Sequence, residues 1–346
     1  MASKPDWYER DSRFIAAHQQ PAGLIDLCLS RGIDSHRLLR GTGLFHADIL
    51  AGNTLISPEQ FLLLIDNAQR LLDADDSSFL FGQRLLPGHH GAASQALALA
   101  GNLQQALELL GELRALLAPL LSPRLLLDEH YAYVYWLDSC GAGVQQRFLL
   151  EASITAVVAL ARQLCGERLP WQFHFTHAQP RYVEQYWVHL GEDLHFNSPY
   201  NLLRLPRHYL TRALPQAALT TAVVACQQAR EQLLANGPRA SLLDCLQRWL
   251  LRHVREAPSL ERAAAAFAMS PATFKRKLSK HATSYQQQHD QVRLQVALYL
   301  YQVKGYSNDQ VASHLHFHDA TNFRRSFKRW TGVPPSALRR WLTGEV

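Results

Sequence analysis

A short pattern occurs twice near the carboxyl end of the chain, about fifty residues apart, and it strongly restricts how that region can fold. The first copy is Phe274-Lys275-Arg276-Lys277-Leu278 and the second is Phe323-Arg324-Arg325-Ser326-Phe327. In each copy the apolar residues stand at positions i and i+4, which share one face of a helix, while the two cations that follow the first apolar residue point elsewhere. Each copy therefore predicts a helix that buries one side and exposes paired cations.

The residues before each copy are also alike, because a short apolar stripe at helical spacing ends in a break. The stripes are Leu260, Ala263, Ala264 and Phe267 before the first copy, and Val311, Ala312 and Leu315 before the second. Ser270-Pro271 and Asp319 are typical of the start of the next helix. A helix, a tight turn and a basic helix form the helix-turn-helix unit, whose second helix enters the DNA major groove.

An amphipathic stretch, 285–304, joins the two units. As a helix it would span roughly 30 Å at about 1.5 Å per residue, close to the roughly 34–36 Å between major-groove faces one turn apart. A rigid helix here would let two recognition helices contact adjacent groove segments. The alternative is a helical bundle whose basic faces are merely solvated.

The charge distribution favours DNA binding. Residues 241–346 hold 16 Lys and Arg against 7 Asp and Glu, a net charge of +9, whereas residues 1–240 carry −3. A basic module on a slightly acidic body is the electrostatic pattern of a phosphate-binding domain, although a solvated basic face would give the same count.

The rest of the chain predicts a mixed α/β domain ending near residue 210. Residues 1–20 are expected to be loosely ordered. Ser57-Pro58-Glu59 predicts a helix start. The predicted helices are 21–39, 60–72, 97–117, 145–164 and 181–190; the predicted extended segments are 125–137, 171–177 and 194–205. A helix at 216–234 is expected to connect the domains, and Asn236-Gly237-Pro238 predicts the linker. The expected division is 1–210, a connecting helix and linker at 211–240, and an all-α domain of two helix-turn-helix units at 241–346.

With these residues in view, 259–340 resembles the DNA-binding domain of the AraC/XylS family of bacterial transcription regulators. The resemblance is carried by the run 270–278, by Arg293 and Ala297 in the joining helix, and by the run from Phe323 to Pro335. More weakly, 173–180 and 196–214 resemble the ligand-binding domain of the arabinose-operon-regulator-like branch. That resemblance implies an effector domain with a small-molecule site and dimerisation, without fixing arabinose as the ligand.

The family motif implies which residues contact DNA. These are Ala272, Thr273, Lys275 and Arg276 in the first unit, Thr321, Asn322, Arg324 and Arg325 in the second, and Lys280, Lys328 and Arg329 as phosphate contacts. Arg suits guanine and Asn suits adenine, whereas phosphate contacts position the protein without specifying sequence. The family usually has Gly where His316 and Ala268 stand and Arg where Ala272 stands, which leaves open the bases that the first helix contacts.

The partners expected are double-stranded promoter DNA, a second copy of the chain, a small-molecule effector and RNA polymerase. The sequence predicts no cofactor, no metal and no membrane segment. The five Cys are scattered without a C-x-x-C pair, which argues against disulfides or structural zinc and favours the reducing cytoplasm. His314 and His318 lack the further ligands that a metal site needs. The family that the chain resembles includes activators, but the sequence does not decide between activation and repression.

Two other functions stay open. The amino-terminal domain could bind a protein in place of a small molecule. Less favoured is an enzyme fused to a DNA-binding domain, because neither Cys28 nor Cys226 has the cationic surroundings that activate a thiol.

Overall fold

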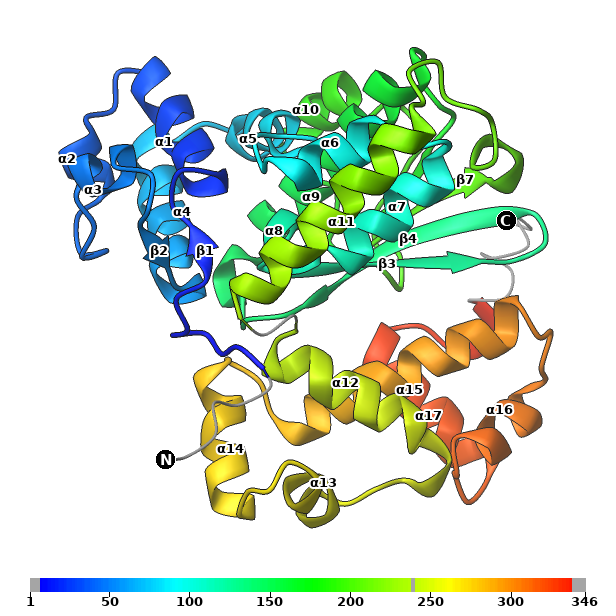
Figure 1. Ribbon diagram of the computed structural model, residues 1–346. Coiled ribbons are helices and arrows are strands. Elements are labelled where there is room, and N and C mark those ends of the chain that lie inside the picture. Colours follow the sequence, from blue (N-terminus) through cyan, green and yellow to red (C-terminus); the bar gives the residue numbers. More distant parts are fainter. Residues whose placement is uncertain (1–6, 238–239, 338–346) are drawn as a thin grey trace.

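The computed structural model describes residues 7–237 and 240–337 (Figure 1). Its buried apolar side chains form two clusters. The larger one draws on residues between Tyr8 and Leu233, and the smaller one on residues between Leu242 and Phe327. In Figure 1 the segments that supply the first cluster form the upper body, and those that supply the second form the helical unit below it.

A five-stranded sheet of order β3-β4-β7-β5-β6 organises the upper body. Its strands are β3 (Leu121–Leu127), β4 (Tyr131–Asp138), β5 (Gln172–His174), β6 (Leu194–His195) and β7 (Leu202–Pro206). All neighbouring pairs are antiparallel except β5 and β6. Pro123 lies in β3, an edge strand, where a residue without an N–H is tolerated. The aromatic and β-branched run at 125–137 is confirmed as parts of two strands, and 171–177 contains a third.

One long helix, α9 (Gln146–Cys165), forms the centre of the upper body. It packs against α5 (Ser77–Leu85), where a Cβ on Gly82 would lie 2.4 Å from the Ala152 carbonyl oxygen. With the preceding 3-10 turn η1 (Gly143–Gln145) it has the length and apolar composition of a membrane span, a feature that the sequence prediction missed. However, 72% of that apolar window is buried inside the structure, so α9 is accounted for as a core helix.

Capping side chains and a glycine set the ends of several helices at the amino end of the chain. They are α1 (Gln20–Ser30), α2 (Ser35–Leu38), α3 (His46–Leu50) and α4 (Pro58–Leu72), with a short antiparallel pair of strands, β1 (Ile15–Ala16) and β2 (Leu55–Ile56). The predicted start of α4 is confirmed, since Ser57 and Gln60 form a reciprocal capping box. The single helix predicted at 21–39 is wrong, because Gly32 takes a φ of 77° and Asp34 caps a separate α2.

The single helix predicted at 97–117 is also wrong. It is three helices: α6 (Ala92–Ala98), α7 (Leu103–Glu112) and α8 (Arg114–Leu117). Asn102 starts α7 by accepting a hydrogen bond from the Gln105 N–H at 2.9 Å, which provides a new cap within an otherwise continuous apolar pattern. Helix α11 (Leu219–Ala235) packs against α6, and α10 (Val183–His189) and the 3-10 turn η2 (Arg207–Tyr209) complete the body.

The lower unit is entirely helical in its described part. Its elements are α12 (Leu242–Arg252), the 3-10 turn η3 (Val254–Glu256), α13 (Leu260–Ala266), α14 (Pro271–Lys280), α15 (Tyr285–Gln302), α16 (Asn308–His314) and α17 (Ala320–Thr331). Together the two parts confirm the expected fold class: a mixed α/β body followed by an all-α unit with two helix-turn-helix motifs joined by a long helix.

The amino-terminal segment differs from the prediction of loose order. The Tyr8 N–H donates to the Ala240 carbonyl at 3.0 Å, and the Leu242 N–H donates to the Tyr8 carbonyl at 3.0 Å. We call residues 7–14 the amino-terminal arm. The arm is ordered because it pairs with a segment more than two hundred residues away. A local sequence pattern does not reveal such a pairing. Residues 1–6, Pro238 of the predicted linker and 338–340 of the family-like stretch lie outside the described residues.

Candidate nucleic-acid interface

The twin pattern forms two equivalent helices, α14 and α17, each anchored by its apolar pair. Phe274 and Leu278 of α14 and Phe323 and Phe327 of α17 are all at most 1% exposed and share one core. Both helices start as the sequence predicts: the Ser270 side chain caps α14, and the Asp319 carboxylate accepts from the Asn322 N–H at 2.7 Å. The buried residues fix how each helix is rotated, and therefore which residues face outwards.

The two cation pairs face solvent. Lys275 and Arg276 are exposed on α14, and Arg324 and Arg325 are exposed on α17. The Arg324 guanidinium is held along its own helix, donating to the Ala320 carbonyl and the Thr321 hydroxyl, both at 3.3 Å. These exposed guanidinium and ammonium groups can donate to phosphate or to base edges.

The smaller side chains predicted to contact DNA lie in the first turns of the same helices. Ala272, Thr321 and Asn322 are exposed and Thr273 is half-buried. The Asn322 amide donates to the Asp319 carboxylate at 3.0 Å, and the Thr273 hydroxyl accepts from Ser270 at 3.0 Å. In this structure, therefore, Asn322 and Thr273 support the helix caps, and to contact a base Asn322 would exchange its bond with Asp319.

The three predicted phosphate contacts differ in their surroundings. Lys328 is exposed on α17. Arg329 pairs with Asp290 of α15 at 3.1 Å. Lys280 pairs with Asp11 of the amino-terminal arm and lies 3.8 Å from the Glu9 carboxylate. Acidic side chains of the protein would thus compete with DNA phosphates for two of these three cations.

The turn of each unit contains a residue in the left-handed region. Ala268 has a φ of 53° and His316 a φ of 57°. These are the two positions where the sequence carries a non-glycine residue in place of the family's usual Gly. Both side chains are exposed, so the strain of the left-handed backbone is not offset by burial.

Helix α15 holds the two units at a fixed separation. Its 18 residues correspond to about 27 Å of rise. Val292, Val296 and Leu300 bury one side of it in the shared core, and the Arg293 guanidinium lies 4.8 Å from the centre of the Phe317 ring, which follows the second unit's turn. The joining helix is therefore packed against both neighbours along its length.

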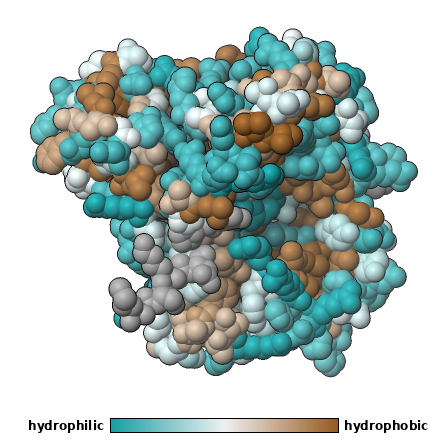
Figure 2. Space-filling model, in the orientation of Figure 1, coloured by the Kyte–Doolittle hydropathy of each residue, from teal (hydrophilic) through white to brown (hydrophobic). Residues whose placement is uncertain are grey.

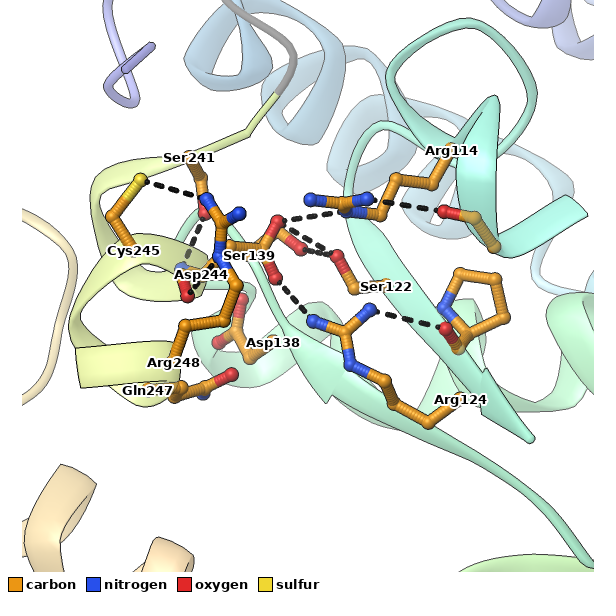
Figure 3. Close-up of polar contacts among 12 residues, drawn as sticks. Arg114, Ser122, Arg124, Asp138, Ser139, Ser241, Asp244, Cys245, Gln247 and Arg248 are labelled. Atoms are coloured by element: carbon orange, nitrogen blue, oxygen red, sulfur yellow. Dashed lines mark hydrogen bonds and ion pairs between the residues drawn. The ribbon is translucent and has the colours of Figure 1, made fainter. Parts of the chain in front are cut away.

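A buried ionic network that sequence analysis missed connects the two parts of the chain (Figure 3). Asp244 of α12 has a fully buried side chain that accepts from Arg114 at 3.1 Å and from Arg124 at 2.8 Å. The Ser122 hydroxyl also donates to it, at 3.0 Å. Burial raises the pKa of Asp244, but the two guanidinium groups and the Ser122 hydrogen bond outweigh this effect and hold the pKa below its ordinary value.

The amino-terminal arm makes a second bridge between the parts. Glu9 pairs with Lys277 of α14, and the Arg10 N–H donates to the His281 ring at 3.1 Å. The Arg10 guanidinium donates to the Gly141 carbonyl at 3.0 Å. A Cβ on Gly141 would lie 2.3 Å from the His281 carbonyl oxygen, so the backbones themselves meet closely here.

The histidines considered as metal ligands have protein neighbours. His314 lies 3.3 Å from the Arg255 guanidinium, and His318 lies 3.5 Å from Asp319. Within residues 7–237 and 240–337, no three His, Cys, Asp or Glu side chains are grouped so that they could hold a metal ion.

Two helix-turn-helix units with outward-facing cations, joined by a packed helix and attached to a mixed α/β body, define a DNA-binding transcription regulator. Two family models match. The arabinose-binding domain of AraC transcription regulators matches residues 32–214, and a helix-turn-helix domain matches residues 263–340. The chain belongs to the AraC family of transcription regulators.

Relatives extend this finding. The ornithine utilization regulator of Pseudomonas aeruginosa is 30% identical over 318 residues, which cover 91% of this chain and 94% of that protein. The regulator GadX of Escherichia coli is 35% identical over 78 residues, 22% of this chain and 28% of its own length. Among solved structures, the regulator CdpR of Pseudomonas aeruginosa aligns over 93% of this chain and 98% of its own, with 17% identity and a TM-score of 0.45.

Proposed function

We propose that α14 and α17 enter successive major-groove segments on one side of promoter DNA. In this proposal Arg276 and Arg325 contact base edges, with Ala272, Thr273, Lys275, Thr321, Asn322 and Arg324 at the same interface, and Lys280, Lys328 and Arg329 bind phosphates. The observation that carries it is the equivalence of the two exposed cation pairs, each set by a buried apolar pair.

Substitution of one arginine tests this interface. Arg325→Ala is expected to weaken specific promoter binding by about 1–3 kcal/mol, the usual contribution of a good side-chain contact to a base. Arg252→Ala removes the same charge from an exposed position on α12 and serves as the control. Binding of both variants to the promoter and to random DNA is measured by fluorescence anisotropy. Unchanged discrimination in Arg325→Ala would remove Arg325 from the base-contacting set.

We further propose that residues 1–210 form the effector and dimerisation domain, that 211–240 connect the domains, and that 241–346 bind DNA. The start of the smaller cluster at Leu242 supports the boundary at 241, whereas the larger cluster extends to Leu233, so α11 also packs into the body. The family model that matches residues 32–214 is named for the binding of arabinose, a small molecule, and this supports a small-molecule effector. A thermal-shift screen of metabolites separates this proposal from a domain that binds a protein partner, because a saturable stabiliser identifies a ligand.

Homodimerisation is also part of the proposal, with α11 as the contact. Four apolar side chains of this helix are more than half exposed: Leu219, Val223, Val224 and Leu234. Figure 2 shows an apolar patch where α11 crosses the front face. A second copy of the chain would bury this face. Val223→Asp is expected to shift the protein towards monomer in analytical ultracentrifugation. Thr211→Asp, at an exposed position outside α11, is the control; equal effects, or none, would exclude α11.

A cytoplasmic location and contact with RNA polymerase complete the proposal, supported by relatives that are transcription regulators. We infer that the chain is not an enzyme with a reactive thiol. Burial raises the pKa of Cys28 to about 11 and also raises the pKa of Cys226, which disfavours the thiolate. A thiol-labelling assay that finds one hyper-reactive Cys would reopen the enzymatic alternative.

A further inference from the structure

A cavity lies between the sheet of the upper body and α15 of the DNA-binding unit. Its volume is about 200 Å³. In Figure 2 the recess between the two halves contains apolar side chains. The walls come from β3 and β4, the start of α9, the segments around Thr176 and 199–202, and one face of α15. The lining residues are Leu126, Tyr133, Tyr135, Trp136, Leu137, Gln146, Thr176, Pro199, Tyr200, Asn201, Leu202, Gln291, Leu294, Gln295, Leu298 and Gln302.

None of these lining residues is charged. Tyr133 and Tyr135 are two residues apart on β4, so their side chains project from the same face of the strand. The Tyr133 hydroxyl is already engaged, donating to Asp128 at 2.7 Å. The walls therefore offer aromatic rings, leucines and neutral amides, and an ion entering the cavity would lose hydration without gaining a counter-charge.

Two polar groups of the lining lack a protein partner. The Tyr200 hydroxyl and the Gln295 side-chain nitrogen are both shielded from solvent and make no hydrogen bond within the protein. Burial raises the pKa of Tyr200 well above its ordinary value, so its hydroxyl keeps its proton and can donate. Buried polar groups are nearly always hydrogen-bonded, because an unmade bond is costly. Both residues line the cavity, so each donor lies beside the space that an acceptor could enter.

We propose that this cavity binds a neutral, planar aromatic molecule carrying a carbonyl-type acceptor, which accepts from Tyr200 and Gln295 and stacks against the aromatic wall. The leucine and aromatic side chains that make up most of the lining favour contact with such a ring. The volume favours one or two fused rings.

The site couples ligand binding to DNA binding, and in this respect the inference rests on the proposed function. Tyr200 extends from the upper body to pack against the core of the DNA-binding unit, and Gln295 belongs to the helix that separates α14 from α17. A ligand held by both parts favours one arrangement of the two, so its occupancy changes operator affinity, and operator DNA changes ligand affinity by the same factor.

The matched probes 2-naphthamide and 2-naphthoate test the site. They share a shape, but the first is neutral and the second is an anion. Equilibrium dialysis with the full chain is expected to show saturable binding of 2-naphthamide that is at least about tenfold tighter than that of 2-naphthoate. Equal affinities, no saturable binding of 2-naphthamide, or competition by L-arabinose would overturn the proposal.

Variants locate the bound probe. Tyr200→Phe and Gln295→Leu preserve size and should each weaken 2-naphthamide binding about two- to tenfold, the range for one hydrogen bond. Gln286→Leu, at an exposed position of the same helix, should leave it unchanged. Equal binding by all three variants and the parent would place the probe elsewhere and overturn the assignment.

The two proposals fail separately. The dialysis contains no DNA, so it tests ligand binding in the cavity whether or not the chain binds an operator. Anisotropy with a mapped genomic site, with and without saturating 2-naphthamide, then tests coupling. A changed operator affinity supports it, and an identical affinity contradicts it. Retained operator binding in a chain that takes up no 2-naphthamide would refute the cavity alone.

Discussion

Ala268 and His316 show how a single backbone angle constrains each helix-turn-helix unit. Both turns require a positive φ, a conformation that costs an L-residue roughly 1–2 kcal/mol. Both positions carry a Cβ and expose it to solvent. The turns are retained because the helices on either side are fixed by their buried apolar residues.

Glycine at position 268 should therefore stabilise the chain. Ala268→Gly relieves the left-handed strain but adds conformational entropy to the unfolded chain, so we expect a gain of up to about 1 kcal/mol. Thermal unfolding measures it. Ala265→Gly, at an exposed position in helix α13, is the control and should destabilise. A lower Tm for Ala268→Gly would contradict the strain argument.

Asp244 joins the two parts through a buried ionic contact. Its carboxylate is buried and receives two guanidinium groups. Removal of one member of a buried ion pair leaves the others uncompensated and costs about 3–5 kcal/mol. Asp244→Asn keeps the shape, so the loss should appear in the free energy of unfolding measured by urea titration. A variant as stable as the parent would show that the network contributes little.

The same residue predicts a dependence on pH. Because the pKa of Asp244 is lowered in the folded chain, its carboxylate stabilises the fold above the ordinary aspartate value of about 3.9. That contribution is lost as the pH falls through the lowered pKa. The parent should therefore lose stability in acid more steeply than Asp244→Asn does, as measured by urea titrations between neutral and acid pH. Parallel profiles would contradict this sign.

At the scale of elements, the amino-terminal arm modifies the charge of α14. Glu9 and Asp11 pair with Lys277 and Lys280, so the first recognition helix presents less positive charge than the second. The double variant Glu9→Gln, Asp11→Asn should raise the affinity for double-stranded DNA at low salt. The slope of log affinity against log salt should also steepen, by about one for each further phosphate that the released lysines neutralise.

Anisotropy titrations across a salt series measure this effect. Asp75→Asn with Glu129→Gln removes the same charge from exposed positions outside the arm and is the control. If both double variants show the same salt slope as the parent, the arm does not compete with DNA for these cations.

Helix starts and buried helix faces could be predicted where the residues that determine them are close together in the sequence. The caps at Ser57, Ser270 and Asp319 and the apolar pairs of α14 and α17 depend on residues within one or two turns of each other. The break before α7 was missed because the cap at Asn102 lies inside a continuous apolar pattern. The arm and the Asp244 network were missed because Glu9 and Lys277, like Arg114 and Asp244, are far apart in sequence.

At the scale of the whole molecule, two apolar cores meet at a boundary that contains charged, polar and apolar contacts. The Asp244 network, the arm and the cavity beside α15 all lie between the body and the DNA-binding unit. Relative motion of two domains is the usual expectation unless the interface between them is large and hydrophobic. If the proposed effector binds the body, α12 and α15 are the helices through which it would act on α14 and α17.

In the proposed function, two recognition helices separated by α15 contact one face of DNA. Hydroxyl-radical footprinting of the full chain on a site found by genome-wide mapping tests it most directly. We predict two protected patches on the same face, about 10 base pairs apart, with Arg276→Ala weakening one patch and Arg325→Ala the other. A single patch, or two patches that both variants weaken equally, would contradict the account.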